Sequence, residues 1–429
     1  MRILIKNGRV IDPATKKDGR YDILIENETI IKVEPNLMDE ADNVIDAEGL
    51  FVMPGFIDLH VHLREPGFEY KETIETGAKA AARGGYTTIC PMPNTNPCID
   101  SKEMVEFLMK KEKEESIVHI VPVGAVTDEQ KGIKLADIKG MKQAGAKALS
   151  EDGKSVMDTS LYFQGMKLAA GEDMVILAHC EDKHLVGNGV LNQGKKAEEL
   201  CLEGISNAVE DIIAARDIFL AKASGVKLHL CHCSTADSVR LVKMAKEMGL
   251  LVSAEVCPHH FTLTEDDIFE DDSNYKMNPP LRTKTDREAL KIGLRDGIMD
   301  VIATDHAPHS LEEKEKSIKD APFGIVGLET AFALTMSELV KGGYLTPYEM
   351  VEKMSYNPAR ILGINKGSLA VGKMADITIA DPDRTYVIDS SQFASKGKNT
   401  PFHNREVTGK VVMTMVSGTV VYKEGQNLI

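Results

Sequence analysis

Hydrophobic and polar residues follow two different patterns, one at the ends of the chain and one in its middle. Short apolar runs bounded by polar turns fill the first fifty residues, as where Ile23, Leu24 and Ile25 precede Asn27 and Glu28. The same pattern returns at residues 376–379, 410–416 and 418–422. Runs of this length predict β-strands. Neither end is long enough for a sheet core alone, so we expect both ends to fold together into one small β-domain.

The middle of the chain alternates short β-rich runs with amphipathic segments. Met104, Phe107 and Leu108 recur at helical spacing within residues 101–115, for example. Eight β-rich runs are present, at residues 51–62, 86–93, 117–126, 146–150, 174–180, 226–233, 251–257 and 299–304. Eight strands that alternate with helices predict an α/β fold of the (β/α)8 TIM-barrel type. We therefore expect a catalytic barrel at residues 52–363 and a composite β-sandwich domain at residues 1–51 plus 364–429.

Composition and charge exclude several classes of function. Hydrophobic residues make up 43% of the 429 and charged residues 27%, which is ordinary for a soluble globular protein. With 51 Lys and Arg against 66 Asp and Glu, the formal charge is −15, which repels phosphate backbones and anionic lipids. No run approaches the roughly 18 apolar residues of a membrane span. We expect neither nucleic acid nor membrane as a partner.

The cysteines and the start of the chain indicate a cytoplasmic protein. Seven cysteines, an odd number, are spread from Cys90 to Cys257 and do not form the dense even framework of a small secreted domain. The first residues carry charges at Arg2, Lys6 and Arg9 and lack the apolar core of a signal peptide. Both features predict a reducing compartment.

Polar side chains that could do chemistry end most of the eight runs, where a barrel of this kind places its active site. His60 and His62 are two residues apart on one predicted strand and so share a face. The other candidates are Asp58, Asn94, Glu151, Asp152, His179, Glu181, Asp182, His232, His259, His260, Asp305, His306 and His309. Imidazole and carboxylate together suit Zn²⁺ and similar ions, and the donors present fit two ions that share a carboxylate.

Each of these signals has a plainer explanation when it is taken alone. A His-x-His pair is usually accidental, and a single histidine after a strand is usually structural. Cys231 and Cys233 flank His232 but face the other side of the predicted strand, as does His229. We interpret the two cysteines as packing residues. What favours a metal site is that the remaining candidates fall at the same end of different strands.

Seven motifs appear in an order that resembles the dihydroorotases, within the cyclic amidohydrolase superfamily. They are FIDLHVHLREPG at 56–67, PMPNT at 91–95, HCED at 179–182, CPHH at 257–260, NPPLR at 278–282, ATDHAPH at 303–309 and GLET at 327–330. His-x-His alone marks only the superfamily, whereas the ordered set is specific. The resemblance implies a metal-dependent barrel with a composite β-domain. It also implies an enzyme of pyrimidine synthesis that interconverts N-carbamoyl-L-aspartate and (S)-dihydroorotate.

The resemblance also implies a metal centre. It makes His60, His62 and Asp305 ligands of one zinc ion and His179 and His232 ligands of the other. Asp152 and a hydroxide would bridge the two ions. In the mechanism that this implies, the hydroxide attacks the ring carbonyl and Asp305 acts as general base and then general acid.

The same resemblance implies a set of substrate contacts. These are His62, Arg64, Asn94, Asn278, His309, Phe323 and Gly324. Arg64 can bind the substrate carboxylate with two parallel N–H donors, and the plainer alternative is an ion pair with Glu65. Two zinc ions, Arg64 and a protonated His309 would make the site locally positive, so the total charge of −15 does not exclude an anionic substrate.

Several alternatives stay open. Many relatives of this branch bridge their metals with a carbamylated lysine, and Lys147 could fill that role. The loop Glu151-Asp152-Gly153 favours Asp152, although relatives have a first Asp where this chain has Glu151. A sister activity on allantoin or hydantoin and a non-catalytic scaffold are the other functions considered. The presence of all expected ligands and of Arg64 favours a dihydroorotase.

The remaining expectations concern partners and motion. The resemblance implies a homodimer and an association with aspartate transcarbamoylase, as in some family members. The charged run LEEKEKSIKD at residues 311–320 follows the last barrel strand and predicts a mobile loop that could act as a lid.

Overall fold

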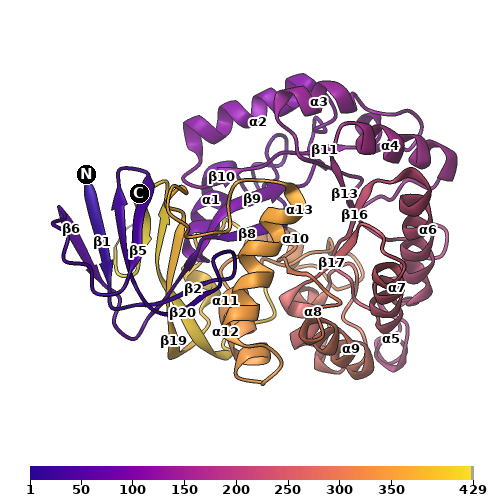
Figure 1. Ribbon diagram of the computed structural model, residues 1–429. Helices are drawn as coiled ribbons and strands as arrows, with labels where there is room; N and C mark the ends of the chain where they lie inside the picture. The colour runs from indigo at the N-terminus through magenta and orange to yellow at the C-terminus, as the bar shows by residue number, and fades with distance from the viewer. Residues whose placement is uncertain (427–429) are drawn as a thin grey trace.

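Parallel strands joined by helices form a closed barrel in the computed structural model, which describes residues 1–426 (Figure 1). The first sheet has the order β10–β9–β8 and the second the order β11–β12–β13–β16–β17–β18. A parallel bridge from Val61 to His306 joins β8 to the segment after β18. The strands are β8 (Phe56–Val61), β9 (Tyr86–Pro91), β10 (His119–Ile120), β11 (Val123–Ala125), β12 (Ala148–Ser150), β13 (Val175–Ala178), β16 (Lys227–Leu230), β17 (Val252–Val256) and β18 (Val301–Ile302). Each lies in one of the eight predicted runs, so the barrel prediction is confirmed.

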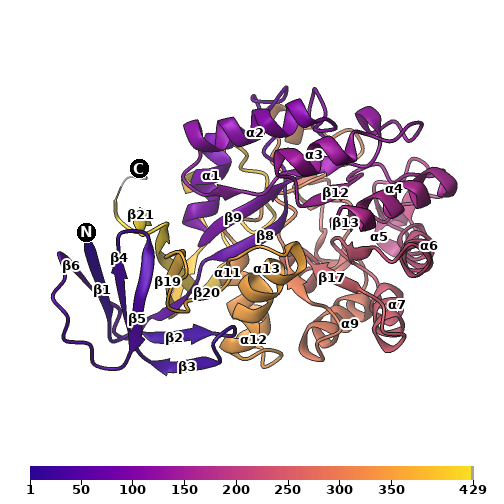
Figure 2. The ribbon, with the colours of Figure 1, turned by 45° about the horizontal axis from the view of Figure 1, so that its top comes forward.

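Helices cover the outside of the barrel (Figure 2). The helices are α1 (Ile74–Arg83), α2 (Lys102–Glu115), α3 (Ile138–Ala144), α4 (Thr159–Gly171), α5 (Lys195–Glu199), α6 (Ala208–Ser224), α7 (Ala236–Glu247), α8 (Pro258–Thr262), α9 (Lys284–Arg295), α10 (Leu311–Lys314), α11 (Ala331–Thr335), α12 (Pro347–Val351) and α13 (Asn357–Leu362), of which the short α8 and α10 lie in the connections that follow the carboxyl ends of β17 and β18. Hydroxyl side chains cap several of them, as where Thr73, Ser101 and Thr235 each accept a hydrogen bond from a backbone N–H of the first turn. Among residues 1–426, no helix is long and apolar enough to cross a membrane.

Strands from both ends of the chain share one sheet, which lies beside the barrel in Figure 1. That sheet has the order β21–β20–β19–β7–β2–β3, and a second sheet has the order β5–β4–β1–β6. The strands are β1 (Arg2–Lys6), β2 (Arg9–Asp12), β3 (Lys17–Arg20), β4 (Asp22–Glu26), β5 (Thr29–Glu34), β6 (Asn43–Asp46), β7 (Phe51–Pro54), β19 (Ile377–Val387), β20 (Glu406–Val416) and β21 (Thr419–Lys423). Ile25, Val52 and Ile379 belong to one buried apolar cluster. The composite β-domain is therefore confirmed, while its exact boundaries stay a prediction.

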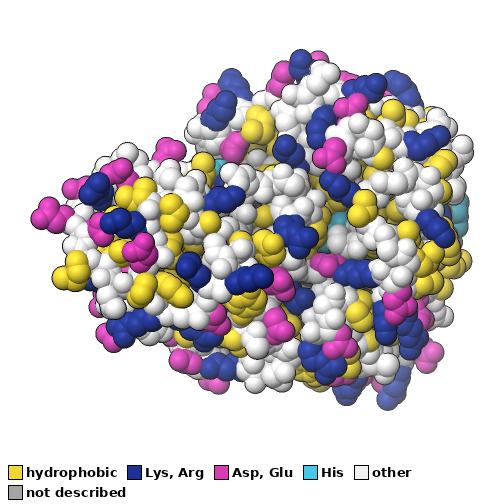
Figure 3. Space-filling view, viewed as in Figure 1, with side chains coloured by type: hydrophobic (Ala, Val, Ile, Leu, Met, Phe, Trp, Pro, Cys, Tyr) yellow, Lys and Arg dark blue, Asp and Glu magenta, His cyan; other side chains and the backbone are white. Residues whose placement is uncertain are grey.

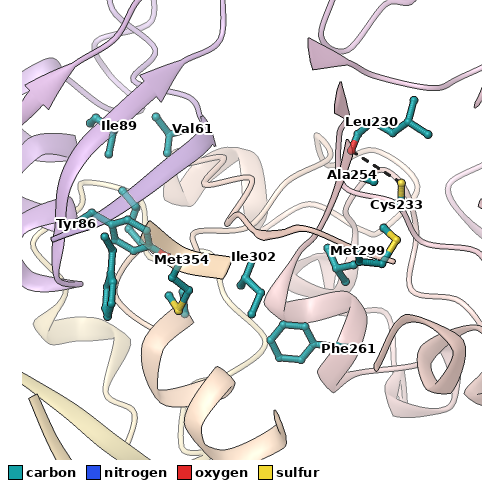
Figure 4. Close-up of a cluster of buried hydrophobic side chains, with 14 of the residues drawn as sticks. Val61, Tyr86, Ile89, Leu230, Cys233, Ala254, Phe261, Met299, Ile302 and Met354 are labelled. Carbon is teal, nitrogen blue, oxygen red and sulfur yellow. Dashed lines mark hydrogen bonds between the residues drawn. The ribbon is translucent and has the colours of Figure 1, made fainter. Parts of the chain in front are cut away.

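Buried apolar side chains fix the strands against the helices (Figure 4). Tyr86 and Ile89 of β9 and Ile302 of β18 belong to one large cluster. Phe56 stacks on Phe332 of α11 with ring centroids 5.7 Å apart. Burial of each aromatic ring of this kind stabilises the fold by roughly 1.5–3 kcal/mol. This packing holds the carboxyl ends of the strands in fixed relative positions.

The charged segment at residues 311–320 differs from the predicted loop. Its first residues form α10, which begins with a capping box between Ser310 and Glu313. Lys314 is buried, and its Nζ donates hydrogen bonds to the carbonyl oxygens of Pro322 at 3.2 Å and Gly324 at 3.1 Å. The charge pattern alone did not reveal that one lysine of the run points inward. A role for the segment as a lid stays a prediction.

Candidate active site

Six buried histidine and aspartate side chains meet at the carboxyl ends of five barrel strands. They are His60, His62, Asp152, His179, His232 and Asp305. His60, His62 and Asp305 form one group whose candidate ligand atoms lie within 4.8 Å of one another, and His60, Asp152 and His232 form another. His179 joins them, with Nδ1 2.9 Å from His232 Nε2. The structure thus brings together all six residues that the sequence proposed as ligands.

Asp152 lies at the centre of this cluster. Its Oδ1 is 3.2 Å from His60 Nε2, 3.5 Å from His179 Nδ1 and 3.7 Å from His232 Nε2, and its Oδ2 is 3.5 Å from His62 Nε2. Burial raises the pKa of Asp152, but the surrounding histidines outweigh burial and hold that pKa well below its ordinary value. The carboxylate is therefore ionised and faces several imidazoles at once.

Lys147, the rival for the bridging position, lies elsewhere. It precedes β12 and Asp152 follows it, so the two residues lie at opposite ends of that strand. Five residues of extended chain span about 16 Å. The Lys147 ammonium lies near Asp173, which precedes β13 and whose pKa is lowered first by the hydrogen bond from Lys227 and also by the charge of Lys147. The cluster therefore contains Asp152 and does not contain Lys147.

Two of the cluster histidines are oriented by a partner on their other ring nitrogen. His60 Nδ1 lies 3.0 Å from Glu255 Oε1, and His62 Nδ1 lies 3.0 Å from Asn94 Oδ1. Histidines that bind metals almost always donate their second N–H to an oxygen in this way. The contacts leave the Nε2 lone pairs of both rings facing the cluster.

Glu255 is a functional candidate that sequence reasoning missed. It is fully buried in β17, and its Oε2 lies 2.9 Å from His229 Nε2. Burial raises the pKa of Glu255, but hydrogen bonds from His229 and His60 outweigh it, so the pKa falls well below its ordinary value. The signal was a single acid inside the apolar run at 251–257. His229, which the predicted parity placed away from the metal, contacts Glu255 and Ser253 instead.

Unsatisfied polar atoms in the cluster fit a bound cation. His179 Nε2 and His232 Nδ1 are buried and have no hydrogen-bond partner among residues 1–426, and the 3.2 Å contact of His60 Nε2 with Asp152 Oδ1 lacks hydrogen-bond geometry. Such orphaned atoms cost free energy unless something binds them. Four imidazoles and two carboxylates around them are the donors that zinc and similar ions take. The residues present therefore fit a metal site.

The predicted substrate contacts surround the same cluster. A pocket of about 550 Å³ is lined by His62, Arg64, Asn94, Asp152, His179, His232, Asn278, Asp305, Phe323 and Gly324, together with Gly153 and Ala307. His60 and His309 are not part of its lining. His60 lies in the cluster, and His309 lies beside Arg64, with Nε2 3.3 Å from Arg64 Nη2. On the face shown in Figure 3, acidic and basic side chains are interspersed, so the charge of −15 is not gathered into one acidic patch there.

The side chain of Arg64 lines the pocket and does not form a surface ion pair with Glu65. Its backbone has a φ of 62°, in the left-handed region that non-glycine residues rarely adopt. Its Nε donates to the Pro308 carbonyl at 3.2 Å. The alternative partner Glu65 is engaged elsewhere, with Lys111 Nζ at 3.0 Å and the backbone N–H of Ile74 at 2.9 Å. The predicted alternative of an Arg64–Glu65 pair is therefore wrong.

His309 is neutral, so the expectation of a protonated imidazole is wrong. Burial, and then the positive charges of Arg64, Lys71 and Lys314, lower the pKa of His309 to about 2. Its Nε2 donates to the Phe323 carbonyl at 2.8 Å, which leaves Nδ1 to accept from Lys71 Nζ at 3.2 Å. The positive charge on this side of the pocket therefore comes from Arg64 and Lys71. The sequence did not indicate Lys71.

The asparagines are engaged within the site. Asn94 Nδ2 donates to Asp152 Oδ2 at 3.2 Å while its Oδ1 faces His62, so Asn94 links the two. Asn278 Nδ2 donates to Glu181 Oε2. The other strand-end candidates stay outside the cluster, namely Asp58, Glu151, Asp182, His259, His260 and His306.

A family model and curated proteins that match this chain agree on one family. A family model described as "Dihydro-orotase-like" matches residues 49–238. A dihydroorotase of Syntrophus aciditrophicus (strain SB) is 47% identical over 99% of this chain and 100% of its own. One of Bacillus pumilus (strain SAFR-032) is 49% identical over 99% of both chains.

Two solved structures of hydantoinases share the fold of this chain. An L-hydantoinase (dihydropyrimidinase) from Arthrobacter aurescens has a TM-score of 0.89 and 29% identity, and the match covers 100% of this chain and 97% of that one. A D-hydantoinase (dihydropyrimidinase) from Thermus sp. has a TM-score of 0.85 and 28% identity over 100% and 96%.

Proposed function

Because this chain belongs to the dihydroorotase family, we propose that it reversibly cyclises N-carbamoyl-L-aspartate to (S)-dihydroorotate in pyrimidine synthesis. It is a cyclic amide hydrolase by family. The observation that carries the proposal is one pocket that holds both a buried His/Asp cluster and Arg64. A cyclic amide with a carboxylate substituent needs both.

The cluster would hold two zinc ions. His60, His62 and Asp305 would bind one, His179 and His232 the other, and Asp152 would lie between them as the shared carboxylate. When bound, such ions polarise a carbonyl oxygen and make water nucleophilic at neutral pH. Glu255 and Asn94 would keep the rings of His60 and His62 in the ligating orientation.

Asp305 would move the proton. Its Oδ1 lies 3.1 Å from His62 Nε2, and its side chain lines the pocket. In hydrolysis the carboxylate would take the proton of the attacking water and pass it to the ring nitrogen as the amide bond breaks. In cyclisation the same carboxylate would accept the proton of the carbamoyl nitrogen and return it to the departing water.

Arg64 would hold the substrate carboxylate. The hydrogen bond from Nε to the Pro308 carbonyl fixes the plane of the guanidinium and leaves its two terminal nitrogens for a planar anion. Lys71 adds a second positive charge behind His309. Asn278, Phe323 and Gly324 line the pocket and would contact the ring.

The test is an assay in both directions with purified protein. We expect zinc-loaded protein to hydrolyse dihydroorotate and to cyclise carbamoyl aspartate, chelation to abolish both, and zinc to restore both. Absence of dihydroorotate turnover in fully loaded protein would overturn the proposal. The matched control is Asp152→Ala, which keeps Arg64 and the pocket walls while it removes the central carboxylate.

A hydantoinase is the second candidate, because the hydantoinase from Arthrobacter aurescens shares 29% identity and the fold. Hydantoin carries no carboxylate, so Arg64 and Lys71 would have no anionic group to bind in that reaction. Preferred turnover of hydantoin over dihydroorotate would support this candidate. No turnover of either would support a non-catalytic scaffold.

Assembly and location complete the proposal. The family suggests a homodimer and an association with aspartate transcarbamoylase, which gel filtration of the chain alone and mixed with that enzyme would test. The seven cysteines are all free of disulfides, and this supports a cytoplasmic location.

A further inference from the structure

A second group of metal-ligating side chains lies where β17 passes into α8. Cys257, His259 and His260 are 0%, 2% and 3% exposed. One ligand atom from each, a sulfur and two ring nitrogens, lies within 4.8 Å of the others. None of the three belongs to the His/Asp cluster, and the proposed reaction uses none of them.

Two ring nitrogens in this group have nothing to bind. His259 Nε2 and His260 Nδ1 are buried and have no hydrogen-bond partner in the described part of the chain. His260 Nε2 donates to the Pro279 carbonyl at 2.9 Å, which fixes the tautomer and leaves a lone pair on Nδ1. A histidine that donates one N–H to a backbone carbonyl and presents its other nitrogen bare has the orientation of a metal ligand.

Both imidazoles are in the ligating form. Burial lowers the pKa of His259 to about 4, and burial together with His259 lowers the pKa of His260 well below its ordinary value. Their rings are in contact, with centroids 4.2 Å apart and planes tilted by 58°. Two neutral rings this close, each with an unsatisfied nitrogen, are costly to bury unless a cation or a water occupies the space between them.

We propose that Cys257, His259 and His260 form a separate site for one zinc-class ion, bound by a thiolate and two imidazoles. That donor set suits borderline and soft cations such as Zn²⁺ and Co²⁺. On binding, the S–H bond of Cys257 breaks, a sulfur–metal bond forms and the proton leaves to solvent. Ligands about 2.0–2.3 Å from a tetrahedral ion lie roughly 3.3–3.8 Å apart, so donors that lie within 4.8 Å of one another need to approach by no more than about 1.5 Å.

The site would tie α8 to the end of β17. Cys257 is the residue that precedes α8, and both histidines lie within that helix. β17 also carries Glu255, which contacts His60 of the catalytic cluster. An ion at Cys257 would therefore fix the strand end next to the catalytic cluster without contributing a ligand to it.

Cobalt substitution tests the site, because a thiolate bound to Co²⁺ gives a charge-transfer band in the near ultraviolet that imidazole and carboxylate ligands do not give. Metal-free protein is titrated with Co²⁺, and the band and bound cobalt per chain are measured. We expect the band in the unaltered protein and its loss in Cys257→Ser, with one cobalt fewer per chain. The matched control is Cys231→Ser, because Cys231 lies close to His60 and Glu255. This variant should keep the band.

Three results would overturn the proposal: no band in the unaltered protein, a band lost in Cys231→Ser instead, or equal cobalt content with and without Cys257. If Cys257→Ser fails to fold by circular dichroism, His260→Gln gives the same test, because it removes a ligand and keeps the thiol. Dihydroorotate turnover is measured on the same samples. Absence of turnover with the band present would reject the catalytic proposal and leave this one standing.

Discussion

The two halves of the pocket are built differently. The His/Asp half consists of buried side chains at the ends of barrel strands, in which each histidine lies within 3.7 Å of Asp152 and Asp305 lies 3.1 Å from His62. The anion half consists of loop residues, of which Arg64 has a left-handed backbone and His309 is set by contacts with Lys71 and Phe323. Strand geometry therefore fixes the half that would bind metal, while contacts between distant loops fix the half that would recognise the carboxylate.

The largest effect should come from the centre of the His/Asp half. Asp152→Ala removes the carboxylate that four histidines face, so those rings lose their shared anion. We expect at least one metal per chain to be lost. We also expect dihydroorotase activity to fall by more than the roughly 100-fold that is typical when a residue that only orients a metal ligand is changed. Turnover and metal analysis measure this. Lys147→Ala should leave both close to normal, and the reverse pattern would show that the lysine bridges.

Arg64→Lys should weaken binding of the substrate carboxylate and leave metal binding by the His/Asp half unchanged. A lysine keeps the charge but loses the planar pair of donors. Loss of a hydrogen bond to a charged group costs about 1.5–3 kcal/mol, which corresponds to a fall of roughly 10- to 100-fold in kcat/KM. We expect most of it in KM for dihydroorotate, with metal content unchanged. A drop in bound metal would mean that the halves are not separate.

Glu255→Gln should weaken metal binding by the His/Asp half, because Glu255 orients the ring of His60. Glutamine has one acceptor oxygen, whereas His60 and His229 each donate to a different oxygen of Glu255. Metal affinity, measured by competition with a chelator, should fall about 10-fold. Glu75→Gln, on the exposed face of α1, is the matched control. Equal metal affinities in the two variants would show that Glu255 does not support metal binding.

The smallest effect concerns the charge state of His309. Its pKa of about 2 means that the imidazole is neutral at neutral pH, since the protonated form dominates only below the pKa. Lys71→Met removes a repelling cation, so the pKa should rise, while burial keeps it below the ordinary value. The histidine signals in an NMR pH titration measure it, and KM should change by less than about 10-fold. An ordinary pKa in the unaltered protein would contradict the neutral assignment.

The same difference explains what could be predicted from the sequence. The barrel, the composite sheet and the meeting of His60, His62 and Asp305 follow from strand periodicity and from the rule that strand ends converge. Glu255 and Lys71 could not be found this way, because each acts on a residue about 200 positions away through one side-chain contact. The charge state of His309 could not be predicted for the same reason, since it depends on cations from two segments, Arg64 and Lys71 after β8 and Lys314 in α10.

The central claim is that both halves act on one substrate, and substrate selectivity tests it most directly. Dihydroorotate and 5,6-dihydrouracil share the ring that the His/Asp half would open and differ only in the carboxylate that Arg64 would bind. In zinc-loaded protein we predict a kcat/KM at least about 100-fold higher for dihydroorotate, a preference typical of sites that leave a buried polar group without its partner. Equal kcat/KM values for the two rings would contradict the account.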